Sequence, residues 1–178
     1  DERCVAPTEH DSNYRMAREI LLNRVQIPLA NLHRMHGEHP PEIAASSYES
    51  DLREFFTKRI GVPRARFDLV MLGLGADGHT ASLFPGMPAV NETEKWVMAQ
   101  HVEKLDSWRL TLTPAAINAA ATVFFVVTGT DKAETVRRVL KDPPDPSTLP
   151  AQAIHPVNGN VRWYFDTGAG KKLKDPVV

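Results

Sequence analysis

Apolar residues recur at helical spacing in two stretches near the start of the chain. The first stretch follows Ser12, a residue type that often caps helices. Its apolar face consists of Met16, Ile20, Leu21 and Val25. The second stretch covers residues 42–60, with Pro41 suited to a first helical turn and Gly61 just past the end. Its apolar positions are Ile43, Tyr48, Leu52, Phe55, Phe56 and Ile60. These patterns predict two helices.

Later segments carry the apolar runs that are typical of strands. FDLVMLGLG, residues 67–75, is closed by glycines and indicates a strand buried on both faces. Further extended segments are predicted at residues 95–102, 108–113, 122–129 and 161–165. Among them we expect a short helix over residues 114–121 and a helix that Thr130 caps. The apolar face of that last helix consists of Ala133, Val136, Val139 and Leu140.

Strands and helices therefore alternate along the chain. No internal repeat is present, and nothing divides the sequence into two parts. We expect one domain over residues 1–178, of the α/β class, built on a mainly parallel sheet. In such sheets ligands bind at the carboxyl ends of the strands, so the residues that follow each strand are the first candidates for chemistry.

The composition mainly argues against certain classes of partner and location. With 21 basic and 22 acidic residues the net charge is -1, so neither nucleic acid nor an anionic membrane surface is indicated as a partner. No apolar run of about 18 residues could span a membrane. No charged-then-apolar leader opens the chain, which gives no sign of export. The single cysteine, Cys4, cannot form an internal disulfide, which fits a reducing compartment.

The stretch GADGHTASLFPG, residues 75–86, directly follows the predicted buried strand. His79 would lie in the crevice at the strand end, and Gly73, Gly75 and Gly78 would let the backbone approach a ligand. Amide groups of the turn, and a helix beginning at residues 80–82, would favour oxyanion or phosphate charge. The alternative is a purely structural turn made by Asp77 and Gly78 and capped by His79.

Three further cations are candidates, and two of them lie at predicted strands. Lys132 follows the strand 122–129, where its ammonium group would reach the same crevice, although composition alone slightly favours an exposed first-turn lysine. Arg109 lies at the start of WRLTLT and faces either a ligand or solvent. Arg3 lies in the acidic start DER, where an ion pair with Asp1 or Glu2 competes with a ligand role.

His33, His36 and His39 form an HxxHxxH spacing that could supply imidazoles to zinc. The stretch contains Gly37 and Pro40, lacks cysteine and has no neighbouring strand or helix to hold three rings in tetrahedral geometry. A solvated loop is the interpretation that we favour, and we predict no metal site.

Five segments together resemble the 6-phosphogluconolactonase family, and the resemblance covers nearly the whole chain. In order they are DERCVAPTEHDSNYRMA, FDLVMLGLGADGHTASLFPG, WRLTLTPAAINAA, VVTGTDKAETVRRVL and LPAQAIHPVNGNVRWYFD. The related glucosamine-6-phosphate deaminases share a GxGxDGH turn, but there an Ala-Phe-Asn-Glu stretch usually follows. In this chain residues 80–85, TASLFP, follow the turn, which favours the lactonase.

The resemblance implies a Rossmann-like three-layer α/β sandwich and hydrolysis of 6-phospho-D-glucono-1,5-lactone to 6-phospho-D-gluconate, in the oxidative pentose phosphate pathway. It implies no metal and no organic cofactor, a cytoplasmic location, and a monomer or weak homodimer. His79 becomes the proposed base with Asp77 beside it. The implied substrate-binding residues are Asp1, Arg3, Gly75, Gly78, Arg109 and Lys132.

Relative to this family, the chain departs at its start. Family members carry an early strand, a glycine-rich phosphate loop and the strand that leads into DER, so we expect the N-terminal strands to be missing here. Two other functions stay open: an amino-sugar-phosphate deaminase or isomerase, and a non-catalytic sugar-phosphate-binding domain.

Overall fold

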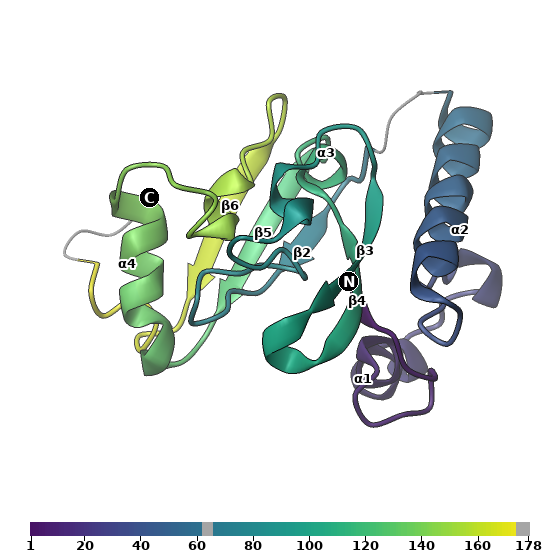
Figure 1. Ribbon diagram of the computed structural model, residues 1–178, viewed down its shortest axis with the longest axis horizontal. Coiled ribbons are helices and arrows are strands. Elements are labelled where there is room, and N and C mark those ends of the chain that lie inside the picture. The colour runs from purple at the N-terminus through teal and green to yellow at the C-terminus, as the bar shows by residue number, and fades with distance from the viewer. Residues whose placement is uncertain (62–65, 174–178) are drawn as a thin grey trace.

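The computed structural model of the chain describes residues 1–61 and 66–173. Two three-stranded sheets lie side by side, with α4 beside one and α2 beside the other (Figure 1). The strands are β1 Glu2–Arg3, β2 Val70–Leu72, β3 Val97–Val102, β4 Ser107–Leu112, β5 Thr122–Val127 and β6 Asn160–Phe165. The helices are α1 Asn13–Ile20, α2 Pro41–Glu54, α3 Pro114–Ile117 and α4 Ala133–Lys141.

One sheet is parallel, in the order β2-β5-β6, and confirms the predicted α/β class. Side chains of β5 alternate, so that Val123, Phe125 and Val127 are buried between the sheet and α4. Phe125 stacks on Trp163 of β6, with ring centroids 3.9 Å apart. Val136 of α4 belongs to the same apolar cluster, which fixes this helix over one face of the sheet.

The opposite face of the parallel sheet is exposed in the described part of the chain. Met71 of β2 is 67% exposed and Leu69 is 45% exposed, so the prediction that residues 67–75 are buried on both faces was wrong. Val126 and Tyr164 lie exposed on the neighbouring strands. The reason is that β2 pairs with β5 alone and that no described helix covers the face of Met71. Of the three predicted layers, the described residues therefore form the sheet and the layer of α4.

The other sheet is antiparallel, in the order β1-β4-β3. The two predicted segments at 95–102 and 108–113 form a hairpin, which the alternation of strands and helices had not specified. Leu110 of β4 is fully buried in one apolar cluster with Leu52 of α2 and Phe56 of the helical turn that follows α2. The short strand β1 adds Glu2 and Arg3 to the outer edge of β4.

Helix α2 confirms the second predicted helix, and a π-helical turn continues it through residues 55–60. Gly61 ends it with φ 74°, a left-handed conformation that glycine adopts without strain. The first predicted helix is shorter than expected, because α1 ends at Ile20. Its predicted apolar face is exposed in the described structure, and its members are Met16, Ile20, Leu21 and Val25.

Helix α1 begins where predicted, and Ser12 caps it by accepting a hydrogen bond from the Arg15 amide at 3.0 Å. Helix α4 begins later than predicted. Thr130 lies inside a 3-10 turn, Thr130–Lys132, and does not cap the helix. The predicted short helix at 114–121 is the single turn α3, and the last predicted strand is confirmed as β6.

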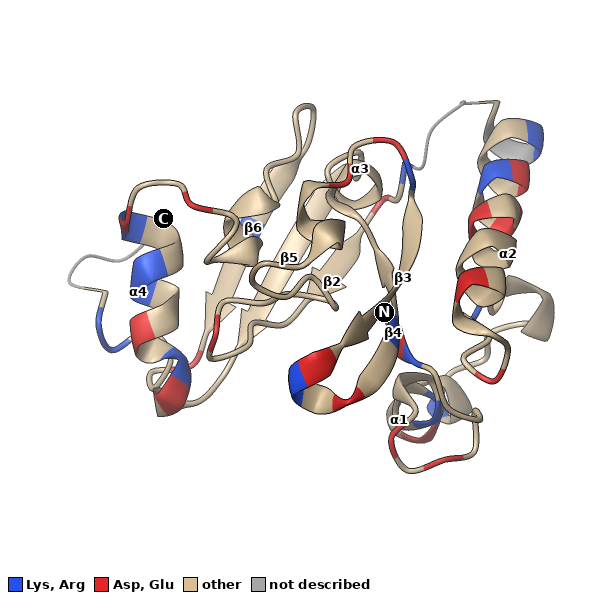
Figure 2. Cartoon of the chain, in the orientation of Figure 1, with Lys and Arg blue, Asp and Glu red and all other residues tan. Residues whose placement is uncertain are grey.

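Both signs of charge occur along α2 and α4, as Figure 2 shows. Within each helix, ion pairs join residues one turn apart, such as Arg53 with Glu49 and Arg137 with Glu134. Among the helices that the structure describes, none has the length and apolar character needed to cross a membrane.

Candidate active site

His79 lies on a closed turn that follows β2. The Gly75 amide donates to the His79 carbonyl at 2.8 Å, and the Gly78 amide donates to the Gly75 carbonyl at 3.0 Å. Gly78 has φ 86°, which few other residues adopt without strain. The backbone therefore returns on itself within five residues and presents the histidine ring at the carboxyl end of the parallel sheet, as the sequence predicts.

Gly75 and Gly78 each lie so close to a neighbouring side chain that a Cβ atom would not fit. A Cβ atom at Gly75 would overlap the imidazole of His79, and one at Gly78 would lie 2.7 Å from Cδ2 of Leu149. The amides of Gly75 and Gly78 both donate inside the turn, so their contribution here is to shape it. Direct contact of these residues with substrate stays a prediction.

The helix expected at residues 80–82 is not formed. Thr80 pairs with Leu83 in an isolated bridge, and Ala81 has φ 48°. The Thr80 hydroxyl donates to the Gly73 carbonyl at 2.8 Å, which ties the chain leaving the turn to the chain entering it. A positive helix end is therefore absent from this part of the described site, and any anion must be bound by side chains or by other amides.

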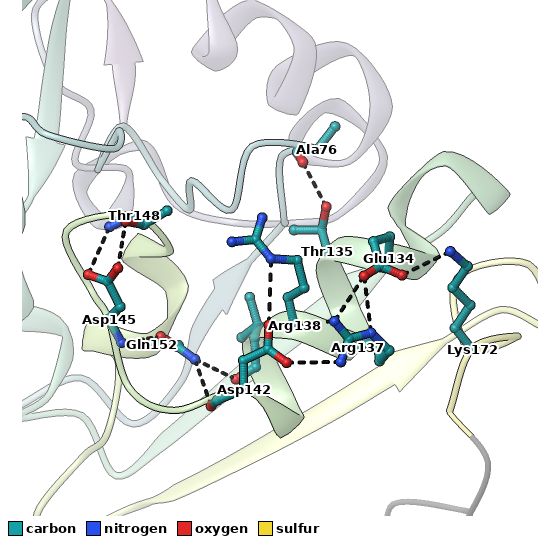
Figure 3. A network of polar contacts seen from close by, with 11 residues as sticks. Ala76, Glu134, Thr135, Arg137, Arg138, Asp142, Asp145, Thr148, Gln152 and Lys172 are labelled. Carbon is teal, nitrogen blue, oxygen red and sulfur yellow. Dashed lines mark hydrogen bonds and ion pairs between the residues drawn. The ribbon is translucent and has the colours of Figure 1, made fainter.

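Two segments from the C-terminal half support the turn from behind. The Thr135 hydroxyl of α4 donates to the Ala76 carbonyl at 2.7 Å, and the Ala151 amide donates to the Gly78 carbonyl at 3.0 Å. Figure 3 shows Thr135 pointing at Ala76, next to a polar network along α4. That network joins Glu134, Arg137, Arg138, Asp142 and Lys172. The hydrogen bond from Thr135 therefore fixes the turn relative to α4, a helix that this network of ion pairs stabilises.

Asp77 and His79 form a hydrogen-bonded pair. Nδ1 of His79 lies 2.5 Å from Oδ1 of Asp77. Because a carboxylate only accepts, Nδ1 carries the proton and Nε2 is left as the basic atom. Burial would raise the pKa of Asp77, but hydrogen bonds from Lys104 and His79 outweigh it and lower this pKa to about 2. Asp77 is therefore ionised at neutral pH.

Two more side chains contact this pair. Lys104, from the connection between β3 and β4, forms an ion pair with Oδ2 of Asp77. The ring of Phe84 lies 4.4 Å from the His79 ring and is almost fully buried. Sequence reasoning missed both residues. Phe84 is one residue of the motif at 75–86, and the motif alone gives it no separate role. Lys104 lies at the tip of a hairpin, and only the folded structure shows that this hairpin packs against the turn.

Arg3 and Arg109 come together on the antiparallel sheet. They are direct cross-strand partners in the β1–β4 pairing, and both are half-buried. Arg3 donates to the Asp11 carbonyl at 2.9 Å and Arg109 to the Ser107 hydroxyl at 2.9 Å. Within the described residues neither guanidinium forms an ion pair. Burial, and then the nearby charge of Arg3, lower the pKa of Arg109.

Glu2 does not pair with Arg3 through its guanidinium. Its carboxylate is buried and accepts from the amides of Asn13 and Tyr14 at 2.7 and 2.8 Å, and from the Ser12 hydroxyl at 3.0 Å. It therefore caps α1 from the neighbouring strand, a role that the sequence alone did not reveal. The ion pair that competed with a ligand role for Arg3 is absent from the described structure.

Asp1 and Lys132 complete the predicted set. Oδ2 of Asp1 accepts from the Ser82 hydroxyl at 2.9 Å. Lys132 lies after β5, as predicted, and pairs with the exposed Asp131 at 2.9 Å. An ion pair with so exposed a partner is weak, so a ligand can compete for Lys132.

Two open clefts meet at His79. One, of about 600 Å³, contains the Asp77–His79 pair together with Arg3, Lys104 and Arg109. The other, of about 920 Å³, is bounded by β2 and by segments around α1, and Lys132 lies on its wall. Asp1 and His79 line both clefts. The structure thus brings all the predicted site residues to one region, with Arg3 and Arg109 on one side of His79 and Lys132 on the other.

The three histidines of the HxxHxxH spacing do not gather. His33 packs near Phe55, at 5.9 Å between ring centroids. Potential ligand atoms of His36, Glu38 and His39 do lie within 4.8 Å of one another. However, Arg34 already makes two hydrogen bonds to the Glu38 carboxylate, at 2.6 and 2.9 Å. Those bonds lower the pKa of Glu38 to about 2.

Comparison with known proteins identifies relatives of this chain both in sequence and in structure. The sequence profile of the glucosamine-6-phosphate isomerases/6-phosphogluconolactonase family matches residues 1–163. A probable 6-phosphogluconolactonase of Arabidopsis thaliana is 38% identical, over 97% of this chain and 68% of its own length. The crystal structure of devB protein has a TM-score of 0.87 at 34% identity and covers 97% of this chain and 71% of its own.

The 6-phosphogluconolactonase from Trypanosoma brucei has a TM-score of 0.80 at 30% identity, over 97% of this chain and 72% of its own. Both the sequence match and the structural match extend over most of the chain, and the family profile includes the turn that carries His79. The chain therefore belongs to the glucosamine-6-phosphate isomerase/6-phosphogluconolactonase family.

Proposed function

We propose that this chain is a 6-phosphogluconolactonase, which hydrolyses 6-phospho-D-glucono-1,5-lactone to 6-phospho-D-gluconate. One observation carries the proposal: a histidine whose Nδ1 is held by a carboxylate faces a cleft that also contains two arginines without carboxylate partners in the described structure. A base beside an anion site is what hydrolysis of a phosphorylated lactone requires. The relatives that carry the lactonase name support the same activity.

His79 serves as the general base. With Nδ1 protonated toward Asp77, Nε2 accepts a proton from water as the water attacks C1 of the lactone. The ionised Asp77 stabilises the imidazolium that forms. When the ring C–O bond breaks, the imidazolium returns the proton to the departing C5 oxygen. The step consumes one water and needs no covalent intermediate.

Arg3 and Arg109 bind the phosphate. Two half-buried guanidinium groups in cross-strand register repel each other, and a phosphate dianion between them removes that cost. Binding the phosphate at a fixed place positions the reacting carbonyl next to His79. The phosphate should therefore contribute to turnover as well as to affinity.

Lys132 polarises the carbonyl. It lines the cleft on the other side of His79, where its ammonium group can stabilise the charge that develops on the C1 oxygen. Its ion pair with the exposed Asp131 is weak, so the substrate can displace Asp131 from the ammonium group. Substitutions of these cations test most directly which of them binds the phosphate and which polarises the carbonyl.

Four further proposals accompany this assignment, on the domain, the location, the oligomeric state and the cofactors. Residues 1–178 act as one lactonase domain, in the cytoplasm, where sugar phosphates are metabolised. The protein works as a monomer or a weak homodimer, with no metal and no organic cofactor, because the base, the water and the cations named above suffice for the reaction.

The family description also includes isomerases that act on glucosamine 6-phosphate, which supports an alternative. In this chain residues 80–82 form a turn of Thr, Ala and Ser, and no carboxylate directly follows the histidine. The carboxylates near His79 are those of Asp77, which is paired with Lys104 and His79, and of Asp1, which accepts from the Ser82 hydroxyl. The lactonase fits these contacts better.

Freshly generated 6-phosphogluconolactone, followed by acid release above its spontaneous rate, provides the direct test. The chain should accelerate hydrolysis, and His79→Gln should lose at least about 100-fold in kcat while keeping its fold. Ammonia release from glucosamine 6-phosphate would support the deaminase instead. Binding of 6-phosphogluconate by a folded chain without turnover of either substrate would identify a sugar-phosphate-binding domain.

A further inference from the structure

Lys104 connects the β3–β4 hairpin to the histidine turn. Its ammonium group pairs with Oδ2 of Asp77, and Oδ1 of the same carboxylate holds Nδ1 of His79. The lysine therefore lies at the far end of a chain of three charged or polar groups that ends at the proposed base. It does not touch His79 through any hydrogen bond that the described structure contains.

An aromatic ring completes the arrangement. The Lys104 ammonium lies 4.7 Å from the ring centroid of Phe84, and that ring packs on His79 at 4.4 Å with planes tilted by 33°. Phe84 is 5% exposed and so provides a fixed surface for both groups. Ammonium, carboxylate, imidazole and aromatic ring thus contact one another in a closed circuit.

We propose that Lys104 is a positioning residue, which holds the Asp77 carboxylate in the orientation that keeps His79 in its Nδ1-protonated form with Nε2 free. The inference rests on the proposed function for its kinetic consequence, although the tautomer of His79 can be measured without any substrate. Lys104 then acts through Asp77 and does not contact the reacting atoms.

This pair differs from the ion pairs that lie within one helix. Arg15–Glu19 and Lys58–Glu54 join residues within one helical turn, where such contacts contribute little. Lys104 lies between β3 and β4 and Asp77 lies in the turn after β2, so the packing of the hairpin against the turn brings them together. Asp77 is 35% exposed, so without a partner on Oδ2 its carboxylate could rotate toward solvent.

The surroundings offer no equivalent replacement for Lys104. The other cations that line the same cleft are Arg3 and Arg109, which donate to the Asp11 carbonyl and the Ser107 hydroxyl. Asp1 bonds to Ser82. None of these groups contacts Asp77 in the described structure, so removing the lysine should leave Oδ2 without a cationic partner.

The test compares Lys104→Met with Lys104→Arg and with the matched control Lys58→Met, which removes an exposed lysine from an ion pair far from the cleft. Nitrogen-15 spectra of the imidazoles, with His79 assigned through His79→Gln, report the tautomer. Kinetics on the phosphorylated lactone and on unphosphorylated gluconolactone report turnover. Urea unfolding confirms that each variant is folded.

We expect Lys104→Met to lower kcat on both lactones by about 10- to 100-fold with KM nearly unchanged, and to shift His79 toward the Nε2-protonated form. Lys104→Arg should restore both, and Lys58→Met should change neither. An unchanged tautomer in folded Lys104→Met would overturn the inference, and so would a loss confined to KM for the phosphorylated substrate. If the wild-type chain hydrolyses no lactone, the proposed function fails, while the tautomer still decides the role of Lys104.

Discussion

Arg3 and Arg109 lie directly opposite each other across the β1–β4 pairing, two like charges in positions where cross-strand pairs usually attract. The neighbouring acid, Glu2, does not neutralise them, because its carboxylate is buried against the first turn of α1. The arrangement costs stability in the unliganded protein. An anionic ligand that binds both guanidinium groups would recover that cost.

Replacing Arg109 should therefore affect the phosphorylated substrate selectively. Because a hydrogen bond between charged groups contributes about 1.5–3 kcal/mol, Arg109→Met should raise KM for 6-phosphogluconolactone by about 10- to 100-fold. KM for unphosphorylated gluconolactone should hardly change. Arg18→Met, an exposed arginine on α1, is the control. Equal effects of Arg109→Met on the two lactones would show that the phosphate binds elsewhere.

Replacing Lys132 should give a different kinetic pattern. If Lys132 stabilises charge on the C1 oxygen, Lys132→Met lowers kcat by about 10²-fold on both lactones, because the interaction forms mainly in the transition state. A parallel assay of the two substrates checks this. A rise in KM for the phosphorylated lactone alone would instead make Lys132 the phosphate ligand and would exchange its role with that of Arg109.

A single methyl group at Gly75 should inactivate the site. The added Cβ would overlap the His79 ring, so Gly75→Ala must displace the imidazole or open the turn. We expect at least about 100-fold loss of kcat, since a misplacement of about 1 Å can have that effect. Gly170→Ala is the control, because its Cβ would make only ordinary contacts, at 3.5 Å from the Asp166 carbonyl, and Gly170 lines neither cleft. Comparable losses in both variants would contradict the steric explanation.

Substitution of Glu2 should weaken the fold. Glu2→Gln keeps the shape, but the carboxylate accepts from four donors, the Ser12 hydroxyl and the amides of Arg3, Asn13 and Tyr14, two at each oxygen. The NH2 group of glutamine would therefore face two of these donors. We expect a loss of about 1–3 kcal/mol in the free energy of unfolding, measured by urea denaturation. Glu19→Gln, at the exposed end of the same helix, should change it much less, because an exposed ion pair within a helix contributes little to stability. No difference between the two variants would refute the capping role.

The only cysteine should report on the N-terminal strand. Burial raises the pKa of the Cys4 thiol to about 11, although the charge of Arg109 opposes this shift. Because the thiolate is the reactive form, native Cys4 at pH 8 should react with a disulfide reagent about 100-fold more slowly than in the unfolded chain. The raised pKa stabilises the fold below pH 9 or so, and that contribution disappears as the pH rises through 11. Similar rates in native and unfolded protein would contradict this.

Local periodicity predicted much of the fold. Helix α2 and strand β5 follow from their apolar spacing, because both bury one face against a core that the described chain itself supplies. The apolar face of α1 is a counter-example, since Met16 and Ile20 are exposed. The pattern of β2 likewise indicates two apolar faces, of which the described structure buries one. Sequence spacing reveals that a face is apolar but not what lies against it.

The residues of the candidate site likewise fall into those that the sequence predicts and those that it does not. His79 and Lys132 were predictable because they directly follow strands, and strand ends meet at one edge of a parallel sheet. Lys104 and the capping carboxylate of Glu2 were not, because each acts on a segment far away in the sequence. Their partners depend on how the antiparallel sheet folds against the rest of the molecule, which short-range patterns do not record.

The pairing of residues 2–3 with residues 109–110 also bears on how the protein is made. The first strand leaves the ribosome long before its partner, and contacts between such distant segments tend to form slowly. We therefore expect the arginine pair to form late in folding. A chain with complete helices but an undocked first strand would hold its histidine turn and still lack the anion site. Affinity for phosphorylated ligands thus becomes a measure of how many molecules in a preparation have finished folding.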